Sequence, residues 1–195
     1  MGDVSKQDLV NGVSTGLAAL SILLQVLVGF VLLVALVALF WQPARRLLVE
    51  IRETLFGSEI WVAWAVAAVA TAGSLFFSEY ANFVPCRLCW FQRICMYPLA
   101  FVLLVGALRR DVRNAVQYSF LLPIAGAAVA IYHIYIEQNP NAESAACRAG
   151  GASCATKWID KFSYVTIPVL SLSAFAAIMV LLAFAWSRRE PERHL

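Results

Sequence analysis

Two close pairs of cysteines are the residues of this 195-residue chain whose type and spacing best suit chemistry. Cys86 and Cys89 form a Cys-x-x-Cys motif, which can close a small disulfide and whose thiols often have a lowered pKa. Cys147 and Cys154 are separated by six residues, two of them glycines that let the chain fold back for closure. We expect this second pair to form a flexible, exposed disulfide that an incoming thiolate can attack. Taken alone, an ordinary structural disulfide is the alternative.

An arginine follows the Cys-x-x-Cys motif at a spacing that can influence its chemistry. Cys89 is expected in the first turn of a membrane helix, where unpaired N–H groups and the positive end of the helix dipole favour a thiolate. Arg93 lies four residues further on, so it shares a helical face with Cys89. Because an arginine at membrane depth is costly and usually functional, we expect it to stabilise that thiolate or an anionic cofactor. The alternative is a stapling disulfide, with Arg93 reaching to the membrane surface.

The composition predicts that membrane helices position these residues. Hydrophobic residues make up 62% of the chain and charged residues 14%, whereas a soluble domain is about half apolar and about a quarter charged. The excess lies in long uncharged runs, which are expected to cross the bilayer as helices because their backbone groups must be satisfied internally. The five candidate spans are residues 17–41, 60–78, 89–108, 115–136 and 162–186.

These spans divide the chain into three parts. Residues 1–58 are predicted to hold an N-terminal transmembrane helix (17–41) and a cytoplasmic linker, residues 59–187 a four-helix redox core, and residues 188–195 a charged cytoplasmic tail. The first run is interpreted as a retained helix, because it is too long for a signal peptide and no small-x-small cleavage site follows it.

The basic residues predict the orientation of the spans. Nine lie in one set of loops and five in the other, so the richer set is expected in the cytoplasm. The N-terminus is then outside, the C-terminus is cytoplasmic, and both cysteine pairs lie on the outer face, where disulfides persist. The basic residues do not cluster among aromatics, so nucleic acid is not an expected partner.

The chemistry-bearing segments resemble those of a known family. The stretch Pro85-Cys86-Arg87-Leu88-Cys89-Trp90-Phe91-Gln92-Arg93, with Met96-Tyr97-Pro98 after it, is similar to the active-site segment of the DsbB/BdbC disulfide-bond formation proteins. Ile131-Tyr132-His133, the Cys147 and Cys154 pair and a closing helix follow in that family's order. The resemblance covers roughly residues 60–186.

The resemblance implies an all-α membrane protein with a four-helix transmembrane bundle, to which this chain adds one N-terminal transmembrane helix. It implies a location in the bacterial cytoplasmic (inner) membrane and a bound quinone, ubiquinone or menaquinone, near the outer surface. It also implies a partner, a DsbA-like thioredoxin-fold thiol oxidase that the enzyme reoxidises, with the electrons passing to the membrane quinone pool.

Roles are carried over residue by residue on the same resemblance. Cys89 matches the thiolate that engages the quinone, and Arg93 the residue beside its ring. Cys147 matches the cysteine that forms the mixed disulfide with the partner, and Cys154 the one that passes electrons to Cys86. The close spacing of the loop pair and the extra N-terminal helix depart from the DsbB pattern, so a long mobile partner-binding loop is not implied.

Two further residues receive predictions. His133 is expected near the outer end of its span at the depth of Arg93, where it can hydrogen-bond a quinone oxygen or accept a proton. A satisfied interior histidine is an equal alternative. Cys95 lies within a span and is expected to be a small buried apolar residue rather than a redox group.

Three other interpretations fit the cysteines less well. A zinc site built from all four paired cysteines is disfavoured by their spacing and by the oxidising side of the membrane, so no metal is expected. A vitamin K epoxide reductase-like enzyme also couples thiol pairs to a quinone, but in that family the loop cysteines precede the membrane pair. A non-catalytic membrane subunit stapled by two disulfides is the remaining alternative, although such a subunit has no use for Arg93 at membrane depth.

Overall fold

The apolar runs of the sequence fold as helices. The computed structural model describes residues 2–148 and 152–187, and the predicted tail at 188–195 lies outside the described residues. Within these ranges, five helical segments are long and apolar enough to cross a membrane, namely Val4–Val37, Glu59–Tyr80, Arg87–Arg109, Val112–Gln138 and Ile167–Trp186. The predicted all-α membrane class is therefore confirmed.

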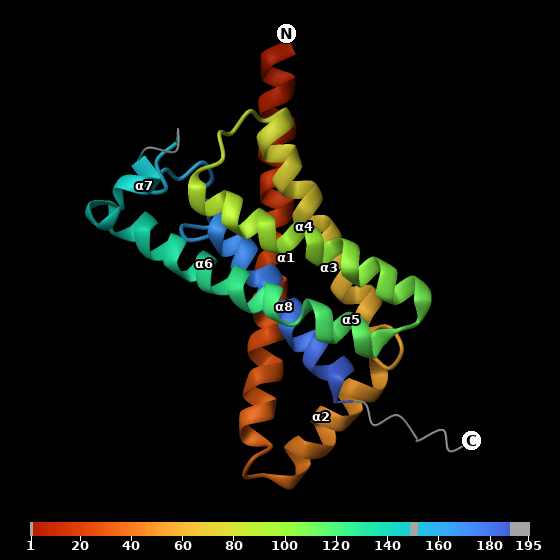
Figure 1. The fold of residues 1–195 in the computed structure, drawn as a ribbon. Coiled ribbons are helices and arrows are strands. Elements are labelled where there is room, and N and C mark those ends of the chain that lie inside the picture. The colour runs from red at the N-terminus through yellow and green to blue at the C-terminus, as the bar shows by residue number, and fades with distance from the viewer. Residues whose placement is uncertain (1, 149–151, 188–195) are drawn as a thin grey trace.

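Four of these segments pack as a bundle around one core (Figure 1). They are α3 (Glu59–Leu75) continued by the π-helical η1 (Phe76–Tyr80), α4 (Arg87–Arg109), α5 (Val112–Ser119) followed by α6 (Leu121–Gln138), and α8 (Ile167–Trp186). Leu99, Leu103 and Phe175 are fully buried in this core, and Cys95 lies in it as predicted. Lipid offers no hydrophobic driving force between helices, so small residues such as Ala63 and Ala67 allow the close packing that holds the bundle together.

The N-terminal helix α1 (Gly2–Val37) crosses the bundle along α8 (Figure 1). Its 36 residues make it about 54 Å long, well beyond the thickness of a hydrocarbon core. Polar contacts fix it at membrane depth: Ser21 donates to the Ser173 hydroxyl over 2.9 Å, and the Gln25 amide donates to the same oxygen over 2.9 Å. The helix begins well before the predicted residue 17, and Lys6 lies over the Tyr80 ring, 5.5 Å from its centre.

The predicted linker is itself a helix, an element that the sequence analysis did not specify. α2 (Gln42–Thr54) alternates basic and apolar residues at helical spacing, as helices that lie at a membrane interface do. Arg45 donates to the Ala38 carbonyl over 2.6 Å, and Arg52 donates to the Ser187 carbonyl, so α2 joins the ends of α1 and α8.

The last span starts later than predicted. Phe162 and Ser163 have φ of 52° and 67°, a left-handed conformation that interrupts a helix, and a bridge joins Lys161 to Val165. α8 therefore begins at Ile167 rather than near residue 162, with Pro168 in its first turn, where proline is favourable.

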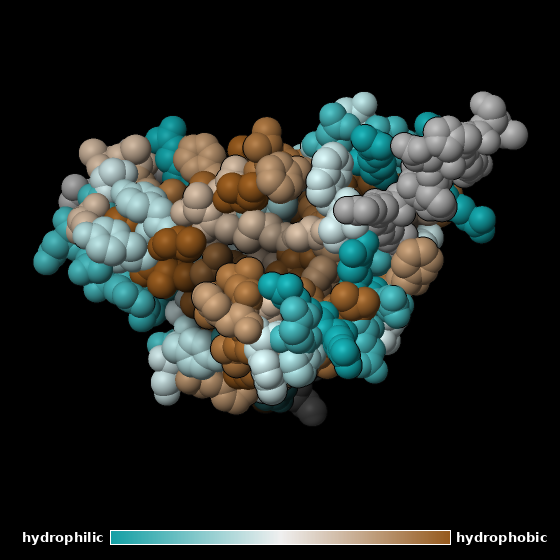
Figure 2. Space-filling view, turned by 90° about the horizontal axis from the view of Figure 1, so that it is seen from below, coloured by the Kyte–Doolittle hydropathy of each residue, from teal (hydrophilic) through white to brown (hydrophobic). Residues whose placement is uncertain are grey.

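The surface has the polarity expected of a bundle that meets lipid. Viewed from the end that carries α2, apolar side chains occupy much of the middle of the face, and hydrophilic ones gather toward its two sides (Figure 2). Along α1, large apolar side chains such as Leu27, Phe30 and Leu33 are at least half exposed, as lipid-facing residues should be.

The contact between α6 and α8 gives a test of the packing. A Cβ on Gly126 would lie 2.2 Å from the ring of the fully buried Phe175. Gly126→Ala should therefore destabilise the protein by about 1–3 kcal/mol, because the ring has no room to move aside. Thermal or denaturant unfolding in detergent measures this loss.

Gly29→Ala is the matched control, since Gly29 is also helical and nothing lies within 4 Å of its added Cβ. This control should be neutral or slightly stabilising. Equal stabilities for the two variants would contradict the described packing of α6 on α8.

Candidate functional site

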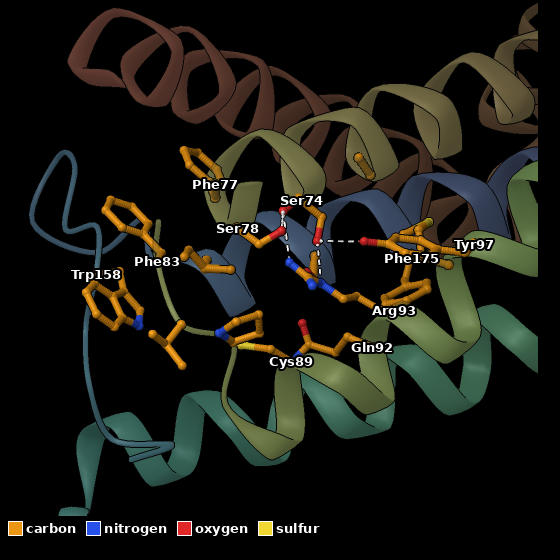
Figure 3. Close-up of a pocket in the computed structure, with 16 residues that line it drawn as sticks. Ser74, Phe77, Ser78, Phe83, Cys89, Gln92, Arg93, Tyr97, Trp158 and Phe175 are labelled. Atoms are coloured by element: carbon orange, nitrogen blue, oxygen red, sulfur yellow. Dashed lines mark hydrogen bonds between the residues drawn. The ribbon is translucent and has the colours of Figure 1, made fainter. Parts of the chain in front are cut away.

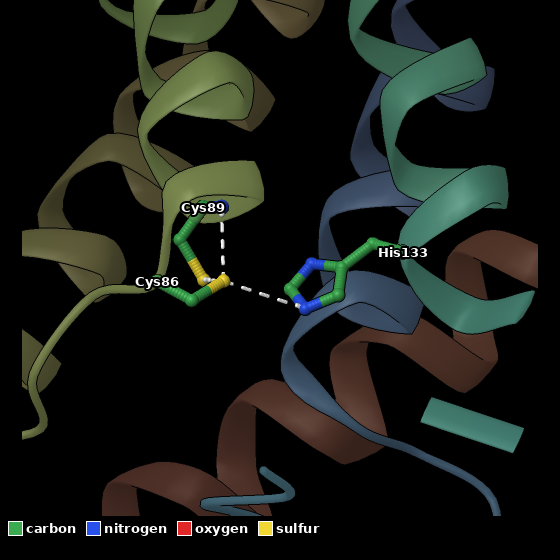
Figure 4. Close-up of side chains that lie close together, drawn as sticks. All are labelled: Cys86, Cys89 and His133. Atoms are coloured by element: carbon green, nitrogen blue, oxygen red, sulfur yellow. Dashed lines mark hydrogen bonds between the residues drawn. The ribbon is translucent and has the colours of Figure 1, made fainter. Parts of the chain in front are cut away.

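The Cys-x-x-Cys motif forms the start of α4. Cys86 has extended backbone angles (φ −73°, ψ 173°) and is the N-cap of the helix, and its sulfur accepts a hydrogen bond from the Cys89 N–H over 3.3 Å. The sulfurs of Cys86 and Cys89 are unbonded and lie 3.2 Å apart, as Figure 4 shows. A sulfur at this position replaces the oxygen that usually caps a helix, so it meets both an unpaired N–H and the positive end of the dipole.

The N–H and the dipole at the start of the helix therefore act mainly on the Cys86 sulfur. Its hydrogen bond with Cys89, followed by that with His133, outweighs burial and holds the pKa of Cys86 well below the ordinary value of a thiol. Cys89 does lie in the first turn, as predicted, but the N–H that was expected to favour its own thiolate is directed at Cys86. Cys86 is thus prepared to carry a negative charge when it is released.

His133 joins the first cysteine pair to the second. The imidazole, 2% exposed, receives the Gln92 amide at Nδ1 over 3.0 Å, while its Nε2 lies 3.0 Å from the Cys154 carbonyl and 3.6 Å from the Cys86 sulfur. Because Gln92 donates to Nδ1, the hydrogen-bond network assigns the proton to Nε2, which then donates to the carbonyl and toward the sulfur. His133 lies between the cysteine pairs, and its predicted contact with a quinone stays a prediction.

The second pair is closed as a disulfide between Cys147 and Cys154. It follows η2 (Pro140–Ala142) and spans from the single-turn α7 (Ala145–Arg148) to the chain after residue 151. The two intervening glycines lie outside the described residues. The expectation of an exposed disulfide was wrong: Cys147 is 4% exposed and Cys154 0%, because the loop folds down onto the end of the bundle. Arg87 helps to hold it there by donating to the Ala146 carbonyl.

Both pairs therefore belong to one buried cluster, which contains Cys86, Leu88, Ile136, Cys147 and Cys154. The members come from α4, α6 and the segment between α6 and α8, so the bundle brings together residues that are far apart in the sequence. The packing therefore places the two cysteine pairs beside each other.

Arg93 lies on the other side of Cys89, in a cavity at membrane depth (Figure 3). Its Nε donates to the Ser74 hydroxyl and an Nη donates to the Ser74 carbonyl, each over 2.9 Å. Ser74 precedes the π-helical η1, and π-helical turns often occur at functional sites. The guanidinium carbon is also 5.3 Å from the centre of the Trp90 ring, a cation–π distance.

Two cavities meet at Cys89. The first, of about 60 Å³, is lined by Arg93, Gln92 and Tyr97 among others, and the second contains Cys86, Cys89 and His133. The first cavity shares Ala70, Ser74, Phe77, Ile167 and Ser171 with an apolar cavity of about 290 Å³ between α1, α3 and α8.

The structure adds three residues that the sequence analysis did not single out. Gln92 orients His133, Ser74 holds Arg93, and Glu143 binds the loop beside Cys154. Gln92 was quoted within the motif, but nothing in its spacing identifies its partner on α6. Ser74 and Glu143 carry no local signal, since their roles arise from tertiary packing.

A membrane helix bundle that buries a Cys-x-x-Cys motif and a second cysteine pair in one cluster has the architecture of a membrane thiol oxidoreductase. Comparison with known families agrees with this class. Residues 57–186 match the family described as disulfide bond formation protein DsbB, and the chain belongs to that family.

Curated relatives of the chain are also named as disulfide formation proteins. The chain is 42% identical over 118 residues to the probable disulfide formation protein C of Halalkalibacterium halodurans, covering 60% of this chain and 85% of the relative. It is 39% identical over 122 residues to the disulfide bond formation protein C of Bacillus subtilis, covering 62% and 87%. A probable disulfide formation protein of Chlamydia pneumoniae is 39% identical over 125 residues, covering 63% and 88%. No solved structure matches the chain significantly.

The contact of His133 with Cys86 makes a testable prediction about pH. Only the thiolate is alkylated, so a lowered pKa lets Cys86 react in mildly acidic solution. His133→Phe removes the N–H donor, raises the pKa of Cys86 and moves the reactivity to higher pH. In fully reduced protein below that pKa, the alkylation rate of Cys86 should fall about tenfold for each unit of the shift, as measured by mass spectrometry.

Tyr132→Phe is the control, because it changes the neighbouring, partly exposed residue on α6 and leaves the imidazole in place. Its alkylation profile should match that of the unmodified protein. A His133→Phe profile that also matches would show that the imidazole does not stabilise the Cys86 thiolate.

Proposed function

We propose that this protein reoxidises a thioredoxin-fold thiol oxidase on the outer face of a bacterial cytoplasmic membrane and passes two electrons to a membrane quinone. Its membership of a disulfide bond formation family supports the thiol chemistry. The observation that carries the proposal is the position of Cys89, which lines both the cavity of Arg93 and the cavity of Cys86 and His133. One sulfur is thus in reach of an exchange partner on one side and of a redox lipid on the other.

The first half of the relay moves an electron pair inward. A partner thiolate attacks the Cys147 sulfur, a bond forms between these two sulfurs, and Cys154 leaves with the electron pair of the broken disulfide. The Cys154 thiolate attacks Cys86, the Cys86–Cys89 bond breaks, and the pair passes to Cys89. His133 supports this step, since it hydrogen-bonds the Cys154 carbonyl and faces the Cys86 sulfur.

The second half restores the loop disulfide. The partner's second thiol loses its proton to solvent and attacks the partner's first sulfur, so the partner leaves oxidised and Cys147 is released as a thiolate. Cys147 attacks Cys154, and Cys86 leaves with the electron pair. The net result is one new disulfide in the partner and two electrons held by Cys86 and Cys89.

The cavity beside Cys89 suits a quinone in size and chemistry. Its volume of about 60 Å³ is room for roughly five water molecules, which is comparable to one six-membered ring. Two guanidinium N–H groups of Arg93 bind Ser74, and a guanidinium has five to offer, so Arg93 can also donate to a ring oxygen. The adjoining apolar cavity gives an isoprenoid tail a path to lipid. A bound quinone would supply the acceptor for the two electrons, with two protons taken from water, and would leave Cys86 and Cys89 joined as a disulfide.

The proposed orientation follows from the basic residues. Arg45, Arg46 and Arg52 lie on α2, and Arg109, Arg110 and Arg113 lie around the turn between α4 and α5, both at the end of the bundle opposite the cysteine pairs (Figure 1). Cytoplasmic loops carry such an excess of positive charge, which leaves the cysteine cluster on the outer face.

Replacing Arg93 tests the proposed quinone site. Arg93→Gln removes the charge that is proposed to bind the ring oxygen, and the KM for a short-chain soluble quinone should rise about 10- to 100-fold, the equivalent of one charged hydrogen bond. Quinone absorbance, followed with a reduced thioredoxin-fold oxidase as electron donor, measures this change. Both disulfides should still form, because neither pair contacts the guanidinium.

Arg109→Gln is the matched control, since this exposed arginine lies at the far end of the same helix. Its kinetics should equal those of the unmodified protein. Cys89→Ser should abolish quinone reduction altogether, and residual turnover in that variant, or an unchanged KM in Arg93→Gln, would refute the proposed site.

A further inference from the structure

A buried carboxylate lies beside the loop disulfide, and the relay described above gives it no task. Glu143 is 8% exposed, and its Oε1 accepts hydrogen bonds from the Cys154 N–H over 2.5 Å and from the Ser153 hydroxyl over 2.9 Å. A carboxylate oxygen of Glu143 and the sulfurs of Cys147 and Cys154 all lie within 4.8 Å of one another. Little water screens a charge at this distance in a buried site, so the carboxylate acts strongly on any charge that forms on either sulfur.

The backbone of Cys154 is held from both sides. Its N–H donates to Glu143, and its carbonyl accepts from His133 over 3.0 Å. Cys147 lies instead on the single-turn α7, where its N–H donates within the loop, to Ser144. Cys154 therefore stays in place, close to Cys86, when the bond to Cys147 breaks.

Along the proposed path, the charged groups near the sulfurs change from a negative carboxylate at the loop to a positive guanidinium beyond Cys89. An anion is disfavoured at Cys154 by the neighbouring carboxylate. It is favoured at Cys86 by the helix start and the imidazole, and the Arg93 guanidinium lines the cavity beside Cys89. A thiolate destabilised by a nearby negative charge is also a stronger nucleophile. Moving the electron pair inward thus relieves a repulsion and gains an attraction.

We propose that Glu143 is a positioning residue that gives the relay its direction: its carboxylate destabilises the Cys154 thiolate, so the electron pair moves on to the Cys86–Cys89 disulfide. This inference rests on the proposed exchange between the two pairs. The chemistry is that of the second exchange, in which the Cys154–Cys86 bond forms, the Cys86–Cys89 bond breaks and Cys89 receives the pair. No proton or further reactant is required for that step.

The test isolates the loop pair in the full-length chain. With Cys86 and Cys89 both replaced by serine, the fraction of reduced Cys147 and Cys154 is measured in glutathione buffers from pH 6 to pH 9. Ionisable groups near this region, among them Arg87, His133 and Glu137, are unchanged in every variant. Quinone is absent, so the result does not depend on the identity of the electron acceptor.

Glu143→Gln should leave the equilibrium unchanged at pH 6, where both reduced thiols are protonated and the carboxylate has no anion to repel. As the pH rises the reduced pair gains a thiolate, and removing the repulsion should then favour the reduced state progressively, by up to about tenfold, the equivalent of one pKa unit. Glu143→Asp keeps the charge, so it should restore the unmodified profile. Asp160→Asn is the matched control, because it removes an exposed negative charge from the same loop without a contact to either sulfur.

Glutamine can still accept the Cys154 N–H, so a purely structural anchor predicts little change in Glu143→Gln and the larger change in the shorter Glu143→Asp. That order, or a Glu143→Gln profile equal to that of Asp160→Asn, would overturn the proposal. Failure to form the Cys147–Cys154 disulfide in both Glu143 variants would likewise make Glu143 a folding residue. Quinone reduction in the otherwise unmodified chain, measured separately, shows whether the proposed function itself stands.

Discussion

The bridge that one buried imidazole makes between two cysteine pairs is the contact on which the rest of the site depends. His133 reaches the Cys86 sulfur and the Cys154 carbonyl with the same nitrogen, while Gln92 fixes the ring from the other side. This arrangement requires that α4, α6 and the loop after α6 meet at one end of the bundle. Without that meeting, the Cys-x-x-Cys motif would be a small disulfide at the start of a membrane helix, and the loop disulfide a staple.

The membrane explains why the charged groups are arranged as they are. A buried or membrane-embedded charge is costly unless it is bound, and two charged groups near the sulfurs are held by specific partners: Arg93 by Ser74, and Glu143 by Ser153 and the Cys154 N–H. Such groups stabilise or destabilise a thiolate much more strongly here than in water. The fold thus places an acid beside the loop sulfurs and a cation beyond Cys89, and the electron pair is proposed to move between them.

Much of this fold could be predicted from the sequence, because the bilayer imposes a simple rule on composition and length. The uncharged runs located the five spans, and the basic residues after Trp41 indicated the segment that connects the first span to the second. The rule failed where local conformation decides the outcome, as at Phe162 and Ser163, whose positive φ angles delay the last helix. It also gave no warning that α2 would be a helix, because an amphipathic interface segment has no long uncharged run.

The chemistry of the site was likewise predictable only in part. The spacing of Cys86, Cys89 and Arg93 identified the motif, since those residues lie within two turns of one helix. The burial of the loop disulfide, the position of Glu143 and the hydrogen-bond partners of His133 were not predictable, because they depend on how separate helices pack. The N–H at the helix start donates to the Cys86 sulfur, whereas the sequence analysis expected it to favour Cys89. The difference arises because Cys86 is the residue that caps the helix.

The most direct test of this account is to ask whether Cys86 and Cys154 can bond to each other. In a Cys89→Ser, Cys147→Ser double variant, these two thiols are left without their usual partners, and mild oxidation followed by peptide mapping reveals which sulfurs have joined. The account predicts an intramolecular Cys86–Cys154 disulfide in nearly all molecules, because both residues belong to the cluster that His133 bridges. Free thiols, or disulfides between separate molecules only, would contradict it.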